Sequence, residues 1–581
     1  MAPAPAWRRY LPGLDVLLRY ERSWLRGDLL AGVTVCAYLI PQVMAYAQIA
    51  GLPAVVGLWG MCAPLLVYAL IGPSRQLSVG PESTTALMTA AGVGALVAVV
   101  GVDRYAEVAS ALALVVGLVC LLGWVARLGY LATLLSKPVL VGYLAGIAVL
   151  MVTSQLGKVT GVDVEGSNPL AEVASLVVGA ADVHLPTLAL ASGTLVVLYL
   201  LHWLRPTWPG PLLVMLAAAV TGWLLGGERI GLRLVGEVPV GLPAPWVPVV
   251  PGLDVWAMVP IAMGIAIVGY SDNVMTSRAF AARHRQPTDA GQELLALGVV
   301  NIATAFLHGF PSSSSGSRTV LGDAMGSRTQ LHSLVALGGV IVVLVVAGPV
   351  LASFPLAALG GVIIYAATRL VDVEEIRRLA RFRRSELVLA AATIAAVVGF
   401  GVLAGIGLAI TLSILNLVRR IARPHDGVLG YVPGVAGMHD VEDYPEATQL
   451  PGLVVYRYDA PLVFANSQDF LTRALQAVEH APTPVEWFVL NAEANTEVDL
   501  TSVDTLAELR DTLAGRGIEF CLARVKQELR ADLAASGLLD SVADDRIFAT
   551  LPSAVTAYAQ WYADRHGKRP PGLPEGFPRV L

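Results

Sequence analysis

Charged side chains are scarce in this 581-residue chain. Asp, Glu, Lys and Arg together make up 14% of it, whereas soluble domains carry about 25%. Hydrophobic residues make up 55%, and the formal net charge is −5. This composition predicts a membrane protein with one soluble appendage, lodged in a lipid bilayer, and the negative charge argues against a nucleic-acid partner.

Several chemical devices are also missing. The four cysteines show neither metal-ligand spacing nor a disulfide framework, so we interpret them as small apolar residues. No GxxxxGK[ST] loop occurs, which excludes an ATPase motor of that kind. Because paired carboxylates, a Ser/His/Asp arrangement and a metal cluster are lacking too, we expect neither an enzyme nor a cofactor. Arginines precede the first apolar run without a cleavage site, so we expect no cleavable signal.

Apolar runs of the length that a bilayer core requires follow one another from about residue 27 to residue 423. They predict an α-helical polytopic membrane protein with fourteen transmembrane segments, at residues 28–46, 52–72, 81–100, 104–126, 138–157, 186–204, 209–227, 254–278, 289–307, 312–325, 330–352, 355–371, 385–402 and 404–422.

Basic residues give this chain an orientation. They gather in the connections expected on one side, whereas the long loops 158–185 and 228–253 on the other side are mainly acidic. Because positively charged loops stay inside, both termini should be cytoplasmic and the protein should cross the cell (inner) membrane an even number of times.

Composition changes near residue 424. Short β-rich runs then alternate with amphipathic helical patterns, which is typical of a small α/β domain. We therefore expect a cytoplasmic N-terminal segment at 1–25, a transmembrane domain at 26–424, a cytoplasmic α/β domain at 440–566 and a disordered tail at 567–581.

One polar stretch, residues 308–319, interrupts the apolar runs with five serines, two glycines, a proline and an arginine. Such a backbone is tolerated in a membrane only where protein buries it or water reaches it. Pro311 marks an expected helix start, after which free N–H groups and hydroxyls would hold an anion at the positive end of the helix dipole. The alternative is a polar re-entrant linker.

A second interrupted stretch, Leu77–Thr85, has the same mixture of Gly, Pro and hydroxyl residues. It opens the third segment and the first stretch opens the tenth, as a 7+7 inverted repeat would arrange them, with repeats at about 26–228 and 254–424. Broken helices at matching places in two halves indicate a transporter's central site. An accidental likeness between two helix starts is the alternative.

These residues resemble the sulfate-permease (SulP, solute carrier 26) anion transporter family, and look closest to its bacterial sulfate permeases. The resemblance rests on Pro41–Pro53, Ser78–Glu82 and Gly309–Thr319, and covers almost the whole chain. Residues 444–466 and Asp499-Leu500-Thr501 look like that family's STAS domain. Soluble STAS relatives are phosphorylated near this last run; helix capping by Asp499, Thr501 or Ser502 is the simpler interpretation.

The resemblance implies the uracil-permease fold. Segments 1–4 and 8–11 would form a mobile core domain, and segments 5–7 and 12–14 a gate domain that also mediates homodimerisation. Substrate would lie between segments 3 and 10, with segments 1 and 8 completing the pocket, and the core would move against the gate as an elevator.

Eight residues are predicted to bind the anion. In the tenth segment the resemblance assigns backbone and hydroxyl donors to the serine–glycine run, and the buried arginine one turn further on would supply positive potential. The third segment would add its own helix start, and two neutral donors spaced i, i+4 on the first segment would line the pocket. These residues are Gln42, Tyr46, Ser83, Thr84, Ser314, Ser315, Gly316 and Arg318.

Three residues are candidates for coupling transport to an ion. Asp272 could take up a proton, which is our first choice, or bind sodium together with Thr276, as in the family's bicarbonate-transporting branch. Asp272 could instead only neutralise Arg318. Glu82 either complements the helix dipole or takes part in coupling.

The sequence thus predicts a secondary active transporter, with proton-coupled sulfate uptake first. Bicarbonate or C4-dicarboxylate transport, possibly sodium-coupled, and a passive anion channel remain as alternatives.

Overall fold

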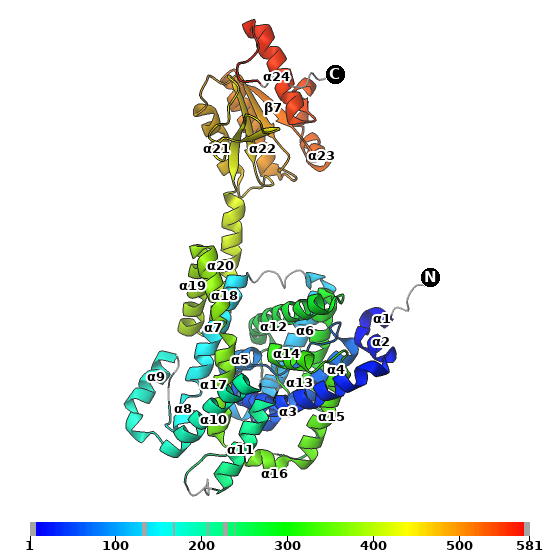
Figure 1. Cartoon of the computed structure of the whole chain (residues 1–581), viewed down its shortest axis with the longest axis vertical. Helices are drawn as coiled ribbons and strands as arrows, with labels where there is room; N and C mark the ends of the chain where they lie inside the picture. The colour runs from blue at the N-terminus through cyan, green and yellow to red at the C-terminus, as the bar shows by residue number, and fades with distance from the viewer. Residues whose placement is uncertain are drawn as a thin grey trace. The chain divides into compact units, whose positions relative to one another are not determined.

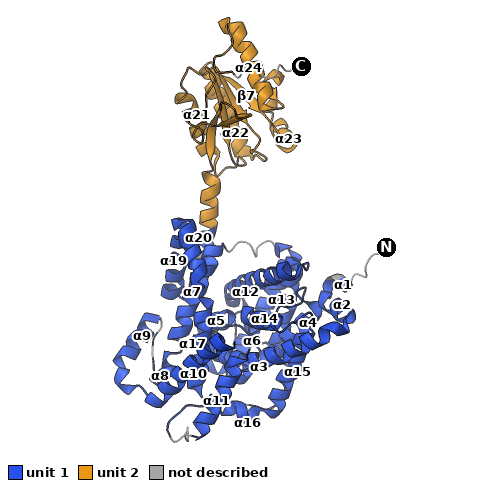
Figure 2. Ribbon diagram, viewed as in Figure 1, with its two compact units in different colours: residues 1–413 blue, residues 414–581 orange. Residues whose placement is uncertain are grey.

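A computed structural model describes residues 7–129, 136–164, 166, 169–205, 208–224, 230–236 and 239–573. The chain separates into two compact units, Met1–Ser413 and Ile414–Leu581 (Figure 2). The first unit is helical, and the second contains a β-sheet covered by helices (Figure 1). Most of the tail expected at 567–581, and the first residues of the segment expected at 1–25, lie outside the described residues.

Each of the fourteen predicted apolar segments contains a helix. They are α3 (Leu25–Ile49), α4 (Ala54–Ile71), α5 (Ser83–Val100), α6 (Tyr105–Val125), α7 (Lys137–Thr153), α10 (Leu185–Leu204), α11 (Gly210–Leu224), α12 (Val255–His284), α13 (Ala290–Ala305), α14 (Gly316–Ala324), α15 (Leu331–Val346), α17 (Leu356–Leu370), α19 (Arg384–Phe400) and α20 (Val402–Ala422).

Seven helices of the described chain are long and apolar enough to cross a membrane. They run over Arg22–Ile49, Ala54–Ile71, Val102–Val125, Lys137–Thr160, Leu185–Leu204, Val255–His284 and Leu356–Phe382. Shorter apolar helices accompany them, among them α5, α13 and α15. The chain is therefore a multi-pass membrane protein, as its composition predicted.

Further helices lie in connections where we expected loops. The loop 158–185 contains most of α8 (Leu156–Thr160) and all of α9 (Pro169–Val178), whereas α16 (Gly348–Ala352) follows α15 inside the predicted segment 330–352. The basic loop after residue 369 holds α18 (Val373–Phe382), which Asp372 caps by accepting the N–H of Glu375. Short helices α1 (Trp7–Tyr10) and α2 (Pro12–Leu18) precede α3.

Small residues let neighbouring helices approach closely. A Cβ on Gly117 of α6 would stand 2.7 Å from the carbonyl oxygen of Gly298 in α13, and one on Gly142 of α7 would stand 2.3 Å from that of Ala390 in α19. Backbone contact of this kind is how helices pack in lipid, where there is no hydrophobic drive between apolar surfaces.

The two interrupted stretches meet in a two-stranded antiparallel sheet. Val79 of β1 (Val79–Gly80) pairs with Ser314 of β2 (Ser313–Ser314), and Gly80 pairs with Ser313. Helix α5 begins shortly after β1, and α14 begins directly after Ser315. The sheet therefore brings two helix N-termini together that lie more than 200 residues apart in the chain.

The expectation that Pro311 starts a helix is wrong. The helix starts at Gly316 instead, because the backbone before it is held in other bonds. Ser312 exchanges two hydrogen bonds with the side-chain amide of Asn301, and the next two residues pair with β1. Extended residues cannot also form the first helical turn.

The second unit carries a six-stranded sheet in the order β4-β3-β5-β6-β7-β8. Strands β5 to β8 run parallel, and β3 pairs antiparallel with both β4 and β5. The strands are β3 (Asp426–Tyr431), β4 (Met438–Asp440), β5 (Leu453–Tyr458), β6 (Trp487–Asn491), β7 (Glu519–Ala523) and β8 (Ile547–Phe548). The predicted α/β fold is confirmed, although β3 lies before residue 440, where we expected the domain to begin.

Alternating side chains fill both faces of this sheet. Phe488 and Leu490 of β6 pack with α21 (Ser467–Glu479), α22 (Leu500–Gly515) and α23 (Gln527–Ala535) on one face. Trp487 and Val489 pack with α24 (Leu551–His566) on the other face. Cys521 is buried and free among them, as are the other three cysteines in their helices.

Candidate functional site

The N-terminus of α14 is open to the surroundings. Its N-cap residue, Ser315, makes no capping hydrogen bond to a backbone N–H of the helix; its hydroxyl lies 3.3 Å from the hydroxyl of Ser317 instead. Gly316 and Ser317 are exposed although Ser314 and Ser315 beside them are buried, and a Cβ on Gly316 would meet no atom within 4 Å. The first backbone N–H groups of α14 therefore face unfilled space, which suits an anion at the positive end of the helix dipole.

Arg318 stands directly behind this helix start and is fully buried. Its guanidinium donates to Ser78 Oγ at 3.3 Å, to Gln42 Oε1 at 3.3 Å and to the Pro81 carbonyl at 3.0 Å. One terminal nitrogen, Nη2, has no hydrogen-bond partner, and no ion pair with a carboxylate is found among the described residues. The groups that hold Arg318 by hydrogen bonds are thus neutral, and the Glu82 carboxylate interacts with its charge without forming an ion pair within the described residues.

Helix α3 contributes a row of neutral donors. Gln42 receives the Arg318 bond with its oxygen and donates to Ser317 Oγ at 3.2 Å with its nitrogen, so it ties α3 to the first turn of α14. Tyr46 lies one turn further on, is buried, and has Ser83 as a neighbour. Tyr38 lies one turn before Gln42, next to Ser317, and so belongs to the same face of α3.

The N-terminus of α5 is closed by its own carboxylate. Glu82 is the N-cap residue, and its side chain accepts the N–H of Thr84 at 2.6 Å and the hydroxyl of Ser83. Ser83 and Thr84 are both buried. Glu82 thus lies at the position where a carboxylate complements the helix dipole, and it engages the Ser83 hydroxyl and the Thr84 N–H of the two predicted anion ligands on α5.

Helix α12 brings Asp272 to the site. Its carboxylate accepts the hydroxyl of Ser314, and the amide oxygen of the next residue, Asn273, accepts the backbone N–H of Ser314 at 2.6 Å. Thr276 lies one turn along α12 and is partly exposed. Asp272 and Arg318 form no ion pair in the described chain, so Asp272 meets the anion site through a serine and not through the arginine.

Buried amides and hydroxyls hold the extended segments in position. Ser78 donates its N–H to Thr319 Oγ1 at 3.0 Å and accepts the N–H of Ser315 at 2.8 Å, which locks β1 to the start of α14. Asn301 of α13 holds Ser312, as described above. These contacts fix the positions of groups that must stay still for a donor cluster to bind selectively.

The structure therefore gathers most of the predicted residues in one place. Gln42, Ser314, Ser315, Gly316 and Arg318 surround the open start of α14, and Tyr46, Ser83, Glu82 and Asp272 lie around them. Sequence reasoning missed four supporting residues, Tyr38, Ser78, Asn273 and Asn301. A polar side chain inside an apolar helix is itself a signal, and it would have singled out both asparagines.

Within the described residues, no group of three or more His, Cys, Asp or Glu side chains could hold a metal ion. Asp272 and Thr276 supply three oxygen ligands at most from their own side chains, two from the carboxylate and one from the hydroxyl. The donor set at α14 consists of N–H, hydroxyl, amide and guanidinium groups, and it is suited to an anion.

The chain is similar to known proteins over nearly its whole length. The model of the sulfate permease family matches residues 25–393, and the STAS domain model matches residues 444–554. A probable sulfate transporter of Mycobacterium tuberculosis is 56% identical over 558 residues, which cover 96% of this chain and 100% of that protein.

Two solved structures share the fold. The murine solute carrier 26 family member A9 anion transporter, in the inward-facing state, superposes with a TM-score of 0.86 at 22% identity and covers 96% of both chains. The transmembrane domain of a cyanobacterium bicarbonate transporter, BicA, gives a TM-score of 0.58 at 23% identity, over 68% of this chain and 98% of that one. The predicted resemblance is confirmed: this chain belongs to the sulfate permease family and carries a C-terminal STAS domain.

Proposed function

We propose that this protein is a secondary active transporter that takes up sulfate together with protons. The observation that carries the proposal is the uncapped start of α14, which faces unfilled space with the buried Arg318 behind it, a residue that makes no ion pair within the described part of the chain. Many neutral donors and one fixed positive charge can replace the hydration shell of a divalent oxyanion. The name of the 56%-identical relative, a probable sulfate transporter, supports sulfate as the substrate.

The same proposal includes the arrangement in the membrane. Fourteen segments in a 7+7 inverted repeat, with both termini in the cytoplasm, agree with one helix in each predicted segment and with the bias of basic residues. Helices α3 to α6 and α12 to α15 would form the mobile core of an elevator, and the remaining spanning helices the gate and the homodimer contact.

Asp272 is proposed as the coupling group. When it is ionised, its carboxylate takes the Ser314 hydroxyl as a donor and repels an approaching anion. Protonation removes the negative charge and frees a donor for the substrate. Proton and anion would therefore bind together, which is what symport requires.

A second candidate is sodium-coupled transport of bicarbonate or a dicarboxylate. The observation that favours it is the spacing of Asp272 and Thr276 by one helical turn, with both side chains partly exposed. A proton needs only Asp272, whereas sodium needs further oxygen ligands. The family and its named relatives are transporters and not enzymes, so the test of function has to measure transport.

The test uses purified full-length protein in liposomes that are given labelled sulfate, bicarbonate or succinate, with and without a pH or sodium gradient. We expect sulfate to accumulate against its gradient only when the outside is acidic. Asp272→Asn should abolish this accumulation and retain sulfate exchange, whereas Thr276→Val should leave both intact. Accumulation driven by sodium and lost in Thr276→Val would establish the second candidate, and sulfate flow that no gradient can drive uphill would indicate a channel.

A further inference from the structure

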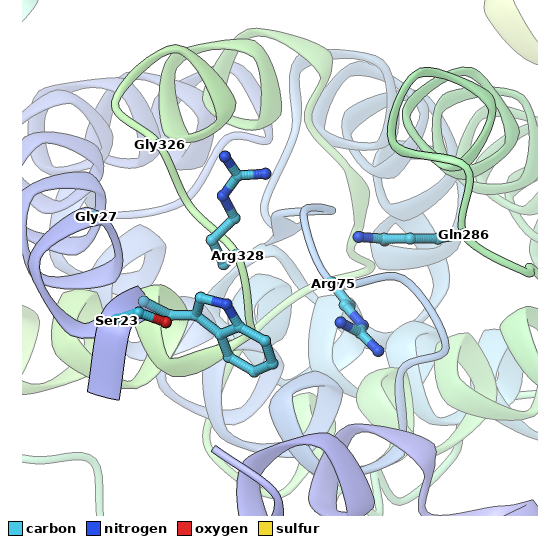
Figure 3. A pocket seen from close by; sticks show the side chains of 7 residues that line it. Ser23, Gly27, Arg75, Gln286, Gly326 and Arg328 are labelled. Carbon is cyan, nitrogen blue, oxygen red and sulfur yellow. The ribbon is translucent and has the colours of Figure 1, made fainter. Parts of the chain in front are cut away.

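A basic cavity in the first unit is lined by none of the residues proposed for the transport site. Its volume is about 430 Å³, and it is open to the surface. The residues that line it come from four separate segments: the one-turn helix before α3 together with the first turn of α3, the connection from α4 to β1, the residues after α12, and the connection from α14 to α15. They are Ser23, Trp24, Gly27, Arg75, Gln286, Gly326 and Arg328 (Figure 3).

The lining is positively charged and not neutralised. None of the described lining residues is acidic, and within the described ranges neither guanidinium is paired with a carboxylate. Arg75 lies over the ring of Trp24 at 5.9 Å from its centre. Figure 3 shows Arg75, Arg328 and the amide of Gln286 arranged around a common space.

A buried carboxylate fixes the backbone below Arg328 without touching its charge. Asp28 is fully buried and accepts the backbone N–H of Arg328 at 2.6 Å and that of Thr329 at 3.1 Å. It also accepts the hydroxyls of Thr329 and Tyr20. With its acceptor sites used in this way, Asp28 holds the connection after α14 in place and leaves the Arg328 guanidinium free for a ligand.

We propose that this cavity binds a phosphate group carried by an organic molecule, either a phosphomonoester in solution or the headgroup of an anionic lipid. Arginine presents a planar fork of donors that fits phosphate oxygens, and Gln286 and Ser23 add neutral donors. The indole of Trp24 offers an apolar face to the organic part. The volume falls in the range of small-molecule pockets, about 300–1,000 Å³.

The site would act on the elements that build the transport site. Helix α3 carries Gln42, the connection after α4 leads into β1, α12 carries Asp272, and α14 carries Arg318. A ligand held between Arg75 and Arg328 would brace the ends of these four segments against one another. This inference goes beyond the proposed function and does not depend on which anion is transported.

Trp24 provides the readout. Full-length protein in phosphatidylcholine nanodiscs is titrated with glycerol 3-phosphate and, separately, with inorganic phosphate, against chloride at constant ionic strength. We expect a saturable change in tryptophan emission that Trp24→Phe removes. The double variant Arg75→Gln/Arg328→Gln should raise the apparent Kd at least about tenfold, because two charge-assisted contacts are lost.

Two controls and one reserve variant make the result specific. Arg278→Gln removes one positive charge from α12 outside the cavity and should respond as the unchanged protein does. Ser315→Asp, which addresses the transport site, should also keep the Trp24 response, so that failure of the transport proposal is distinguishable from failure of this one. Arg328→Gln alone changes an exposed side chain, and it replaces the double variant in the binding test if the double variant does not fold.

Nanodiscs that contain phosphatidylglycerol separate the two sources of phosphate. If the ligand is a lipid, these discs give the ligand-bound emission without added phosphate, and the double variant does not. If it is soluble, discs of either lipid respond to glycerol 3-phosphate in the same way. The proposal is overturned if neither arm gives a saturable change, or if the arginine variants bind as the unchanged protein does.

Discussion

The starts of α5 and α14 lie side by side through the β1–β2 pairing, yet their first turns are built in opposite ways. At α5 the N-cap residue is Glu82, whose carboxylate accepts the backbone N–H of Thr84 and the hydroxyl of Ser83. At α14 the N-cap residue is Ser315, whose side chain accepts no backbone N–H of its helix, and the third helical residue is Arg318. One helix dipole is already neutralised by its own chain, and the other is left for a ligand.

The comparison teaches that a pair of broken helices need not share a substrate equally. An anion near α14 meets open N–H groups and a buried positive charge, whereas an anion near α5 meets a carboxylate that repels it. We infer that α14 carries the binding energy and that α5 supplies the rigid partner, since Ser78 and Pro81 before α5 are acceptors for Arg318.

Arg318→Gln should have the largest effect among the changes that keep the two starts as they are. It removes the buried charge behind α14 and weakens three hydrogen bonds, so sulfate affinity should fall by about 100-fold, or roughly 2.7 kcal/mol. Equilibrium binding of labelled sulfate to the purified protein measures this. Arg318→Lys keeps the charge without the planar fork, so its sulfate affinity should lie between those of the unchanged protein and Arg318→Gln. Unchanged affinity in Arg318→Gln would remove the arginine from the account.

Gly316→Ala places a methyl group in the unfilled space before α14. Because that Cβ meets no atom within 4 Å, the fold should tolerate it, while the anion is pushed away from the helix start. We expect about a fivefold loss of sulfate affinity, or roughly 1 kcal/mol for one lengthened contact. The matched control is Gly94→Ala in α5, where a Cβ also meets nothing, and which should bind normally. Equal effects of both would place the anion elsewhere.

Glu82→Gln tests the comparison at the start of α5, where it removes the capping charge. Loss of the negative charge at α5 should raise sulfate affinity by about twofold to threefold and lower the stability of the helix start by about 1 kcal/mol. Binding and thermal unfolding of the same preparation measure the two effects. If the variant binds sulfate but no longer accumulates it under a pH gradient, Glu82 and not only Asp272 takes part in coupling.

Asp499→Asn should affect only the STAS domain. Its effect on sulfate binding should be the smallest of all these changes. Partial burial raises the pKa of Asp499, but hydrogen bonds from the backbone N–H groups of Phe464 and Ser502 outweigh it and leave the pKa below its ordinary value. The resulting stabilisation is present above about pH 4 and is lost as pH falls through the lowered value.

Hydrogen exchange of the first turn of α22 in the full-length protein should therefore become up to about fivefold faster in Asp499→Asn at neutral pH, because asparagine keeps the capping oxygen but loses the negative charge beside the helix dipole, which is worth up to about 1 kcal/mol. Thr501→Ala, at an exposed neighbouring position, is the control. Sulfate transport should stay unchanged in both. A transport defect in Asp499→Asn would give this residue a role beyond capping.

The helices of the membrane unit were predictable because apolar length is a strong signal, and every predicted segment does contain one. The start of α14 was not. Proline favours a first helical turn, yet Asn301, eleven residues before Ser312, holds the chain extended. A bond formed through space between two elements leaves no mark in local propensity. Helices α9 and α18 were missed because they are too short to be recognised as membrane-spanning segments.

The residues of the site could be predicted, but the difference between the capped start of α5 and the open start of α14 could not. Resemblance and spacing indicated both Ser83 and Ser315, and treated the two helix starts as equivalent. Which of them is capped depends on a side-chain rotation at Glu82 and on the acceptors that Arg318 finds, and neither follows from sequence order. Asn273 was overlooked because its partner, Ser314, lies 41 residues away.

The most direct measurement copies the α5 arrangement into α14. Ser315→Asp places a carboxylate at the N-cap position, where it can accept the first free N–H groups, and Ser315→Asn places a neutral side chain of nearly the same shape there. Labelled sulfate binding to the purified full-length proteins is compared at equal ionic strength. The account predicts no measurable binding by Ser315→Asp and binding within about tenfold of the unchanged protein by Ser315→Asn. Normal binding by Ser315→Asp would contradict it.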